Sequence, residues 1–134
     1  MRSNDLTEAI GETPLVKLPS FSPKSEVQLY AKLEGNNPTG SVKDRIARAM
    51  IEQAEAEGQL VPGRILLEPT SGNTGISLAM VAGRKGYRVR VVIPENVGRE
   101  RIELLKAYGA EITFSPGENG TNGAISVAQE LEAQ

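Results

Sequence analysis

Apolar side chains along this 134-residue chain recur at two spacings, and each spacing predicts a type of element. Alternation over residues 26–33 predicts a strand, and the apolar run 14–18 predicts a shorter strand before it. Helical spacing begins after Gly40 and continues to Gly58, a residue type common at helix ends. Ser41 is expected to cap this helix, because its hydroxyl can accept a bond from an unpaired N–H group.

From residue 65 onward, short apolar strands alternate with helices. The predicted strands cover 65–68, 88–93 and 111–114, and the predicted helices cover 76–85, 98–108 and 124–133. The helix over 76–85 is apolar on nearly all sides, which predicts that it is buried. Strands joined by helices indicate right-handed crossovers and a parallel sheet. The predicted fold class is therefore α/β, an open and mostly parallel sheet with flanking helices.

Two glycine-bearing loops follow predicted strands, at residues 35–41 and 69–75. Ligands of parallel sheets bind at the carboxyl ends of the strands. We therefore expect the two loops to face one cleft.

Composition excludes several classes of function. The contents of 39% hydrophobic and 24% charged residues are ordinary for one soluble domain. A net charge of −2 argues against nucleic acid as the main partner, because phosphate contacts need a basic face. No apolar run approaches the roughly 20 residues that span a bilayer, and the first residues lack the apolar core of a signal peptide. We expect a cytoplasmic protein.

The chain contains neither cysteine nor histidine, which restricts its chemistry. Disulfides, thiol nucleophiles and iron–sulfur sites are excluded, and so are the commonest general base and metal ligand. Exposed helical acids are usually solvated, so we predict no metal site. The acids concerned are Glu52, Glu55, Glu57, Glu100 and Glu103. The bases Arg84, Lys85, Arg88 and Arg90 are interpreted as a charged rim, and Tyr30, Tyr87 and Tyr108 are expected to pack on the core.

Lys43 is the candidate catalytic residue of the first loop. It falls in the first turn of a predicted helix, where the helix dipole disfavours a cation, so it should ionise less readily and act as a nucleophile. A lone lysine is more often a solvated charge. A phosphate-binding Walker loop is excluded, because Ser41 follows the second glycine at the position where that motif needs lysine.

The second loop, Thr70-Ser-Gly-Asn-Thr-Gly75, is a candidate anion site. It combines hydroxyls, an amide side chain and backbone N–H groups at the start of a helix. By itself the pattern fits anion binding and simple helix capping about equally. It lacks the glycine spacing of a dinucleotide-binding loop.

Three segments carry a family resemblance, at Ile10–Leu18, Asn37–Arg45 and Glu68–Gly75. In this order they resemble the cysteine synthase group of pyridoxal-phosphate enzymes, which have the tryptophan-synthase-β-like fold (fold type II). The segment Asn37-Pro-Thr-Gly-Ser-Val-Lys43-Asp-Arg45 is similar to the Schiff-base lysine motif of that group. Ile10-Gly-Glu-Thr-Pro-Leu-Val-Lys-Leu18 resembles its opening segment, and Glu68-Pro-Thr-Ser-Gly-Asn-Thr-Gly75 resembles its substrate-carboxylate loop. The resemblance runs along nearly the whole chain.

The resemblance implies a role for each matching residue. Lys43 would hold pyridoxal 5'-phosphate as an imine and remove the substrate α-proton, and Asn73 would bond the phenolic oxygen of the cofactor. The substrate carboxylate would be held by Thr70, Ser71, Gly72 and Thr74. The implied reaction is β-replacement on O-acetylserine or O-phosphoserine with a sulfur donor, giving L-cysteine. Cystathionine β-synthase-like and serine or threonine deaminase-like reactions remain alternatives, as does a non-catalytic interaction domain.

Enzymes of this group are longer than this chain, which resembles only their N-terminal part. The strands within residues 1–34 would pack on a C-terminal domain that the chain lacks, while residues 35–134 would form the small α/β domain. The group's phosphate-binding loop and its partner for the pyridine nitrogen have no match here. We therefore expect the intact protein to be a homodimeric enzyme and these 134 residues alone to be inactive.

Overall fold

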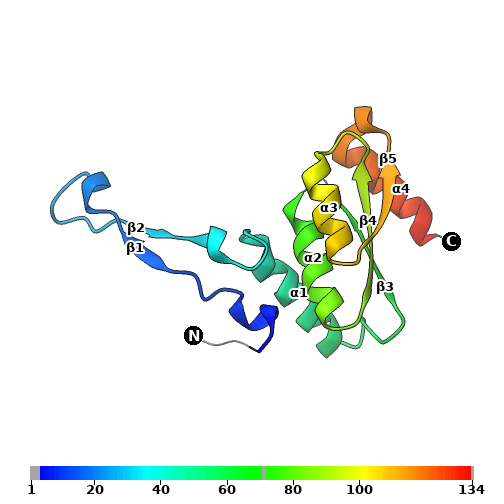
Figure 1. The fold of residues 1–134 in the computed structure, drawn as a ribbon, viewed down its shortest axis with the longest axis horizontal. Helices are drawn as coiled ribbons and strands as arrows, with labels where there is room; N and C mark the ends of the chain where they lie inside the picture. The colour runs from blue at the N-terminus through cyan, green and yellow to red at the C-terminus, as the bar shows by residue number, and fades with distance from the viewer. Residues whose placement is uncertain (1–3, 71, 134) are drawn as a thin grey trace.

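The computed structural model describes residues 4–70 and 72–133, and Figure 1 shows a hairpin that projects from a layered body. The strands are β1 Leu15–Lys17, β2 Tyr30–Lys32, β3 Ile65–Pro69, β4 Arg88–Pro94 and β5 Glu111–Ser115. The helices are α1 Lys43–Ala56, α2 Asn73–Arg84, α3 Arg99–Ala107 and α4 Gly120–Glu132. Short 3₁₀ turns lie at η1 Leu6–Ala9, η2 Pro19–Phe21, η3 Glu34–Asn36 and η4 Gly117–Asn119. We call residues 14–33 the hairpin and the rest of the described chain the body.

The body is built on a parallel sheet with the strand order β3–β4–β5, which confirms the predicted α/β class. Leu66 lies opposite Val89, and Val91 lies opposite Ile112. All three predicted strands of this sheet form, each ending one residue later than predicted. Parallel strands joined by helices place the ends of β3, β4 and β5 at one edge of the sheet.

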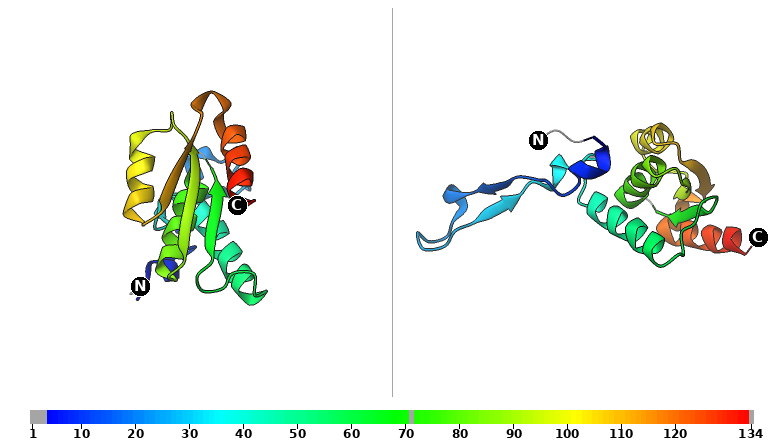
Figure 2. Two further views of the ribbon diagram at one scale, coloured as in Figure 1. Left: turned by 90° about the vertical axis from the view of Figure 1, so that its right-hand side faces the viewer. Right: turned by 90° about the horizontal axis from the view of Figure 1, so that it is seen from below.

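Helices cover both faces of the sheet, with α2 and α3 on one face and α4 on the other (Figure 2). The central strand β4 is therefore buried on both sides: Val91 contributes to the α2 core, and Val92 packs with Ala124 and Ala128 of α4. All residues of α2 from Gly75 to Ala82 are buried, as its largely apolar sequence predicts.

Helix α1 packs against α2 and so extends the layer on that face. Its apolar positions Ala47 and Ile51 are buried in the same cluster as Ile76 of α2. Ile10, just after η1, joins this cluster as well. The start of α1 is thereby held beside α2. No helix within the described residues is long and apolar enough to span a membrane.

The hairpin is shorter than predicted and has little of its apolar surface covered. Its two strands pair antiparallel over three positions, with Val16 opposite Ala31. Proline has no backbone N–H group to donate to a ladder, so Pro14 and Pro19 limit β1, and the predicted strand over 26–33 is reduced to β2. Large apolar side chains remain exposed, including Leu15, Val16, Phe21, Val27, Leu29 and Leu33. Tyr30 is also exposed, so its predicted place on the core is wrong, whereas Tyr87 and Tyr108 do pack on the core.

Two helices begin earlier than predicted. Helix α2 starts at Asn73 instead of residue 76, and α4 starts at Gly120 instead of residue 124. The first N–H groups of a helix need no partner within it, so polar residues outside the apolar pattern can form the first turn. This change moves Asn73 and Thr74 from the predicted loop onto α2.

Candidate active site

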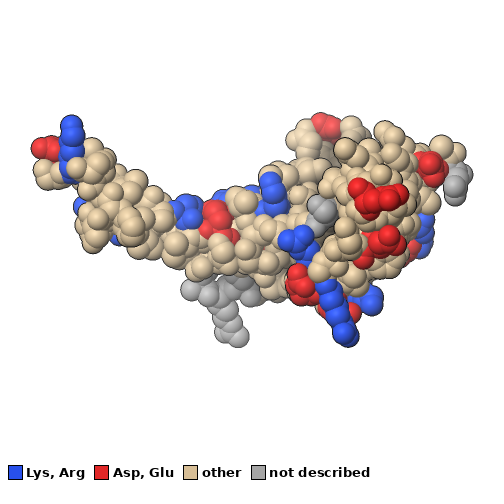
Figure 3. Space-filling view, turned by 90° about the horizontal axis from the view of Figure 1, so that it is seen from above, with Lys and Arg blue, Asp and Glu red and all other residues tan. Residues whose placement is uncertain are grey.

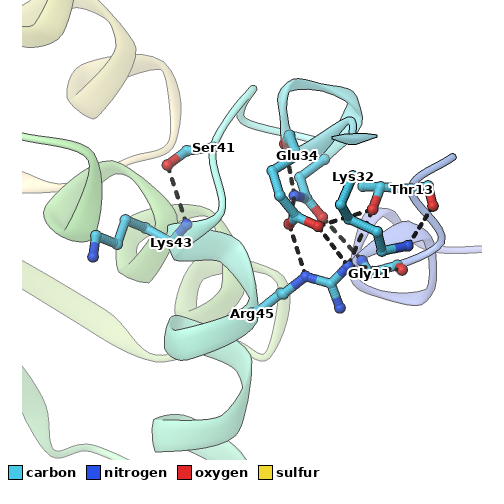
Figure 4. A network of polar contacts seen from close by, with 8 residues as sticks. Gly11, Thr13, Lys32, Glu34, Ser41, Lys43 and Arg45 are labelled. Carbon is cyan, nitrogen blue, oxygen red and sulfur yellow. Dashed lines mark hydrogen bonds and ion pairs between the residues drawn. The ribbon is translucent and has the colours of Figure 1, made fainter. Parts of the chain in front are cut away.

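Lys43 is the first residue of α1, and its side chain is half-buried. Its N–H group donates to the Ser41 hydroxyl over 3.1 Å. Val42 occupies the N-cap position of α1, so the prediction of Ser41 as the N-cap residue is wrong. The Ser41 hydroxyl still accepts a bond from an N–H group of the first turn, as expected. No hydrogen bond or ion pair joins the Lys43 ammonium group to another described residue, and Figure 4 shows the side chain directed away from the network around Arg45. The amine is thus available to a ligand.

Asp44 is completely buried and connects α1 to α2. One carboxylate oxygen accepts from the N–H group of Thr39 over 2.8 Å, and the other accepts from the Ser77 hydroxyl over 2.6 Å. The hydroxyl of Thr39 donates to the carboxylate as well. Thr39 lies in the loop before α1 and Ser77 on α2, so this carboxylate joins the two segments that carry the candidate residues.

Arg45 fixes a second side of the first turn of α1 (Figure 4). Its Nε and Nη2 atoms contact the two Glu34 carboxylate oxygens over 2.8 and 2.9 Å. Nη2 also donates to the Gly11 carbonyl and the Thr13 hydroxyl, so both chain segments at the base of the hairpin meet one guanidinium. Hydrogen bonds from Arg45 and then Asn37 lower the pKa of Glu34 from 4.5 to about 2. We call Gly11, Thr13, Glu34, Asn37 and Arg45 the base network.

Thr70 and Gly72 form the tight connection between β3 and α2. The Thr70 N–H group donates to the Val92 carbonyl over 3.0 Å, and its hydroxyl accepts from the Gly72 N–H group over 3.2 Å. A Cβ atom at Gly72 would meet nothing within 4 Å, so the backbone is open to a close approach. Ser71, the third predicted residue of this turn, lies outside the described residues.

Asn73 and Thr74 are the first two residues of α2; Asn73 is exposed and Thr74 half-buried. The N-cap residue Gly72 supplies no side-chain bond to the first turn, and no acidic residue lies in that turn. Among the described residues no side chain caps the first N–H groups of α2, and such a helix start favours an anion. This segment and the start of α1 are therefore suited to bind an anionic group beside a primary amine.

Loop 35–41 and the start of α2 were predicted to meet at one edge of a sheet, but the contact between α1 and α2 joins them instead. Strand β2 belongs to the hairpin and not to the parallel sheet, so loop 35–41 does not follow a strand of that sheet. Contact between α1 and α2, fixed by Asp44 and Ser77, replaces the predicted shared sheet edge. The only sequence signal for this bond was a hydroxyl within the otherwise apolar run of α2.

Charges elsewhere on the body form ion pairs. Arg84 pairs with Asp5, Lys85 with Glu55, and Arg88 and Arg90 with Glu111, so the charged-rim interpretation is confirmed. Within the described part of the chain no group of three acidic residues is arranged to hold a metal ion.

Comparison with known proteins gives consistent matches. Residues 6–134 match the family model described as pyridoxal-phosphate dependent enzyme. A probable cysteine synthase of Bacillus subtilis (strain 168) is 53% identical over 127 residues, which cover 95% of this chain and 41% of the relative. The chain thus spans well under half the length of this curated relative.

Two solved structures superpose on nearly the whole chain. The cysteine synthase of Entamoeba histolytica aligns with a TM-score of 0.92 and 38% identity, covering 99% of this chain and 40% of its own. An O-acetylserine dependent cystathionine beta-synthase from Helicobacter pylori aligns with a TM-score of 0.89 and 36% identity, covering all of this chain and 45% of its own.

Proposed function

Because the chain belongs to the pyridoxal-phosphate dependent enzyme family, we propose that the whole protein makes L-cysteine from an O-activated serine and a sulfur donor. The half-buried and unpaired amine of Lys43, at a helix start that adjoins α2, is the observation that carries the proposal. The similarity to cysteine synthases supports the choice of reaction.

The residues at the two helix starts fit the cofactor. Lys43 offers an amine without another partner among the described residues, and the uncapped start of α2 favours anionic oxygens. In this proposal Nζ of Lys43 would hold the cofactor covalently, and the side chain of Asn73 would hydrogen-bond its phenolic oxygen. When bound, pyridoxal phosphate withdraws electrons from the substrate α-carbon.

The other residues of the α2 segment would hold the substrate. Thr70, Ser71, Gly72 and Thr74 are proposed to bind the α-carboxylate through hydroxyl and N–H groups, which orients the α-proton. The substrate amine would replace Nζ of Lys43 on the cofactor, and the freed Nζ would take that proton and later return one to the α-carbon. The leaving group departs from the β-carbon with its electron pair as acetate or phosphate, and the sulfur nucleophile takes its place.

A second candidate differs only in the nucleophile. The Helicobacter pylori relative is described as an O-acetylserine dependent cystathionine beta-synthase, and its fold matches this chain nearly as well as that of the cysteine synthase. A thiol amino acid would then replace sulfide. The residues of this chain that we assign act on the amino-acid substrate, which both reactions share.

We further propose that the hairpin packs on a part of the whole protein outside these residues. Its apolar side chains are exposed on both strands, and Figure 3 shows an arm whose visible surface is mostly uncharged between its tip and its base. Without that partner, the chain should self-associate through this surface. Phe21→Ser should weaken the association in sedimentation velocity, and unchanged association would contradict this assignment. The cytoplasmic location expected from the composition and the homodimer expected from the resemblance both stay predictions.

A chimera tests the proposed function. This chain would replace the matching segment of the Bacillus subtilis relative, and the product would be assayed with O-acetylserine and either sulfide or homocysteine. We expect cysteine formation with sulfide, lowered about 100-fold or more by Lys43→Ala because a proton acceptor is lost. Lys24→Ala, in the hairpin, is the matched control.

Turnover of the Lys43→Ala chimera within a few-fold of the parent would contradict the proposal. Preference for homocysteine would favour the cystathionine reaction. The 134 residues alone should take up pyridoxal phosphate weakly and give no turnover, since much of its affinity should come from contacts to its phosphate, for which we assign no residue here.

A further inference from the structure

Asp44 has an environment that stability alone does not explain. Its carboxylate is fully buried, and its hydrogen-bond donors among the described residues are the uncharged groups of Thr39 and Ser77. Burying a carboxylate is costly unless hydrogen bonds compensate for it, and here the donors are groups of Thr39 and Ser77. The carboxylate is therefore expected to serve the placement of neighbouring groups.

The partners of Asp44 lie in the two segments of the candidate site. Thr39 belongs to the loop that leads into α1, and Ser77 lies one turn after Asn73 on α2. Residues four apart share a face of a helix, so Ser77 and Asn73 lie on the same face of α2. The bond of 2.6 Å from Ser77 to Asp44 thus sets the separation between that face and the start of α1.

The first turn of α1 is held at two consecutive side chains. Asp44 is bound to Thr39 and Ser77, and Arg45 is bound to Glu34. Successive residues of a helix point about 100° apart, so these two anchors fix the rotation of α1 about its axis. The direction of Lys43, which precedes them, follows from that rotation.

We propose that Asp44 is a positioning residue that, through Ser77, holds Lys43 in place beside the first turn of α2. The inference rests on the proposed function, because it assigns Lys43 as the residue to be positioned. Asp44 itself touches neither cofactor nor substrate in this assignment. It keeps the amine within reach of an anion-bearing aldehyde bound at the start of α2.

Site-resolved labelling of the chimera with the Bacillus subtilis relative tests the role. Wild type, Ser77→Ala, Asp44→Asn and the double variant would be exposed briefly to pyridoxal phosphate, reduced with borohydride and mapped by mass spectrometry. The readout is the labelling rate of Lys43 divided by that of Lys24, an exposed lysine of the hairpin. We expect the wild-type ratio to exceed one, because the start of α2 attracts the anionic reagent.

Ser77→Ala should lower the ratio about fivefold, the effect of one lost hydrogen bond. The double variant should fall no further than Asp44→Asn, because the two residues act through one bond. Ser126→Ala, an exposed serine of α4, is the matched control, and circular dichroism would verify folding. If Asp44→Asn does not fold, Ser77→Ala alone tests the proposal. This variant should fold, because it keeps the bonds from Thr39 to Asp44.

The outcomes separate the two proposals. A wild-type ratio above one that is unchanged in folded Ser77→Ala would overturn the role of Asp44 and leave the function of Lys43 standing. A wild-type ratio near one would overturn the assignment of Lys43, and the role of Asp44 would fall with it.

Discussion

The hairpin and the body contain similar apolar residues but bury them differently. In the body, Val91 and Val92 of β4 are 0% exposed because α2 and α4 cover the two faces of the sheet. In the hairpin, Leu15 is 62% exposed although it lies in the apolar run 14–18, and Phe21 is 74% exposed. An apolar pattern thus predicts a strand without showing that a second layer covers it.

The regions also differ in how polar groups hold them. The buried polar contacts of the body include the carboxylate of Asp44, which joins helices that already share an apolar core. The residues that flank the hairpin, Gly11, Thr13 and Glu34, are instead held by Arg45 in the base network. We infer that the body carries the folding stability and that the base network orients the hairpin.

The largest expected effect tests this difference in burial. Leu105→Ala, at a leucine of α3 that is 2% exposed, should lower the free energy of unfolding by about 2–5 kcal/mol, because it leaves a cavity. Leu15→Ala, the same substitution in the hairpin, should change it by less than about 0.5 kcal/mol. Urea unfolding of both variants provides the measurement. Equal losses would show that the hairpin is part of the cooperative core.

A smaller effect separates packed from open backbone at the start of α2. A Cβ atom at Gly75 would lie 2.4 Å from Cγ2 of Thr70 and 3.2 Å from Cγ1 of Val91. Gly75→Ala should therefore destabilise the body by about 1–3 kcal/mol through overpacking. Gly72→Ala, where a Cβ atom meets nothing within 4 Å, should be tolerated in thermal unfolding. Similar losses in the two variants would refute the open backbone at Gly72.

The smallest effect is a pH dependence at the base of the hairpin. The pKa of Glu34 is lowered from 4.5 to about 2 by Arg45, so the charged carboxylate stabilises the folded state. That contribution should be complete above about pH 4.5 and be lost as the pH falls toward about 2.

Amide exchange at Gly11, whose N–H group is bound by Asn37, reports on this junction. Exchange at Gly11, corrected for its intrinsic pH dependence, should speed up over that range. Glu34→Gln should remove most of this dependence, whereas Glu26→Gln in the hairpin should preserve it. Asp5 also has a pKa lowered to about 2, chiefly by hydrogen bonds from Thr7, and remains as a background in every variant. An unchanged profile in Glu34→Gln would refute the role of the base network.

The spacing of apolar and turn residues predicted the elements that depend on neighbours along the chain. The strands of the parallel sheet, the buried α2 and the place of Lys43 at a helix start all follow from spacing and turn residues. The early start of α2 was missed because first-turn residues such as Asn73 need not follow apolar spacing. The bond between Asp44 and Ser77 depends on which helix packs beside α1, and periodicity within one segment does not contain that information.

Tyr30 is the hairpin residue that was predicted to pack on the core and is instead exposed. The expectation that these strands need a partner outside the chain agrees with their exposed surface and stays a prediction. The roles of Thr70, Ser71, Gly72, Asn73 and Thr74 came from the resemblance, and they stay predictions as well. Their spacing alone fitted a capped helix equally well.

The most direct test of the central claim is to identify the lysine that binds the cofactor. The chimera with the Bacillus subtilis relative would be saturated with pyridoxal phosphate, reduced with borohydride and digested for peptide mapping. Our account predicts stoichiometric labelling of Lys43 among the lysines of this chain. Labelling of Lys17, Lys32 or any other lysine, with Lys43 unmodified, would contradict it.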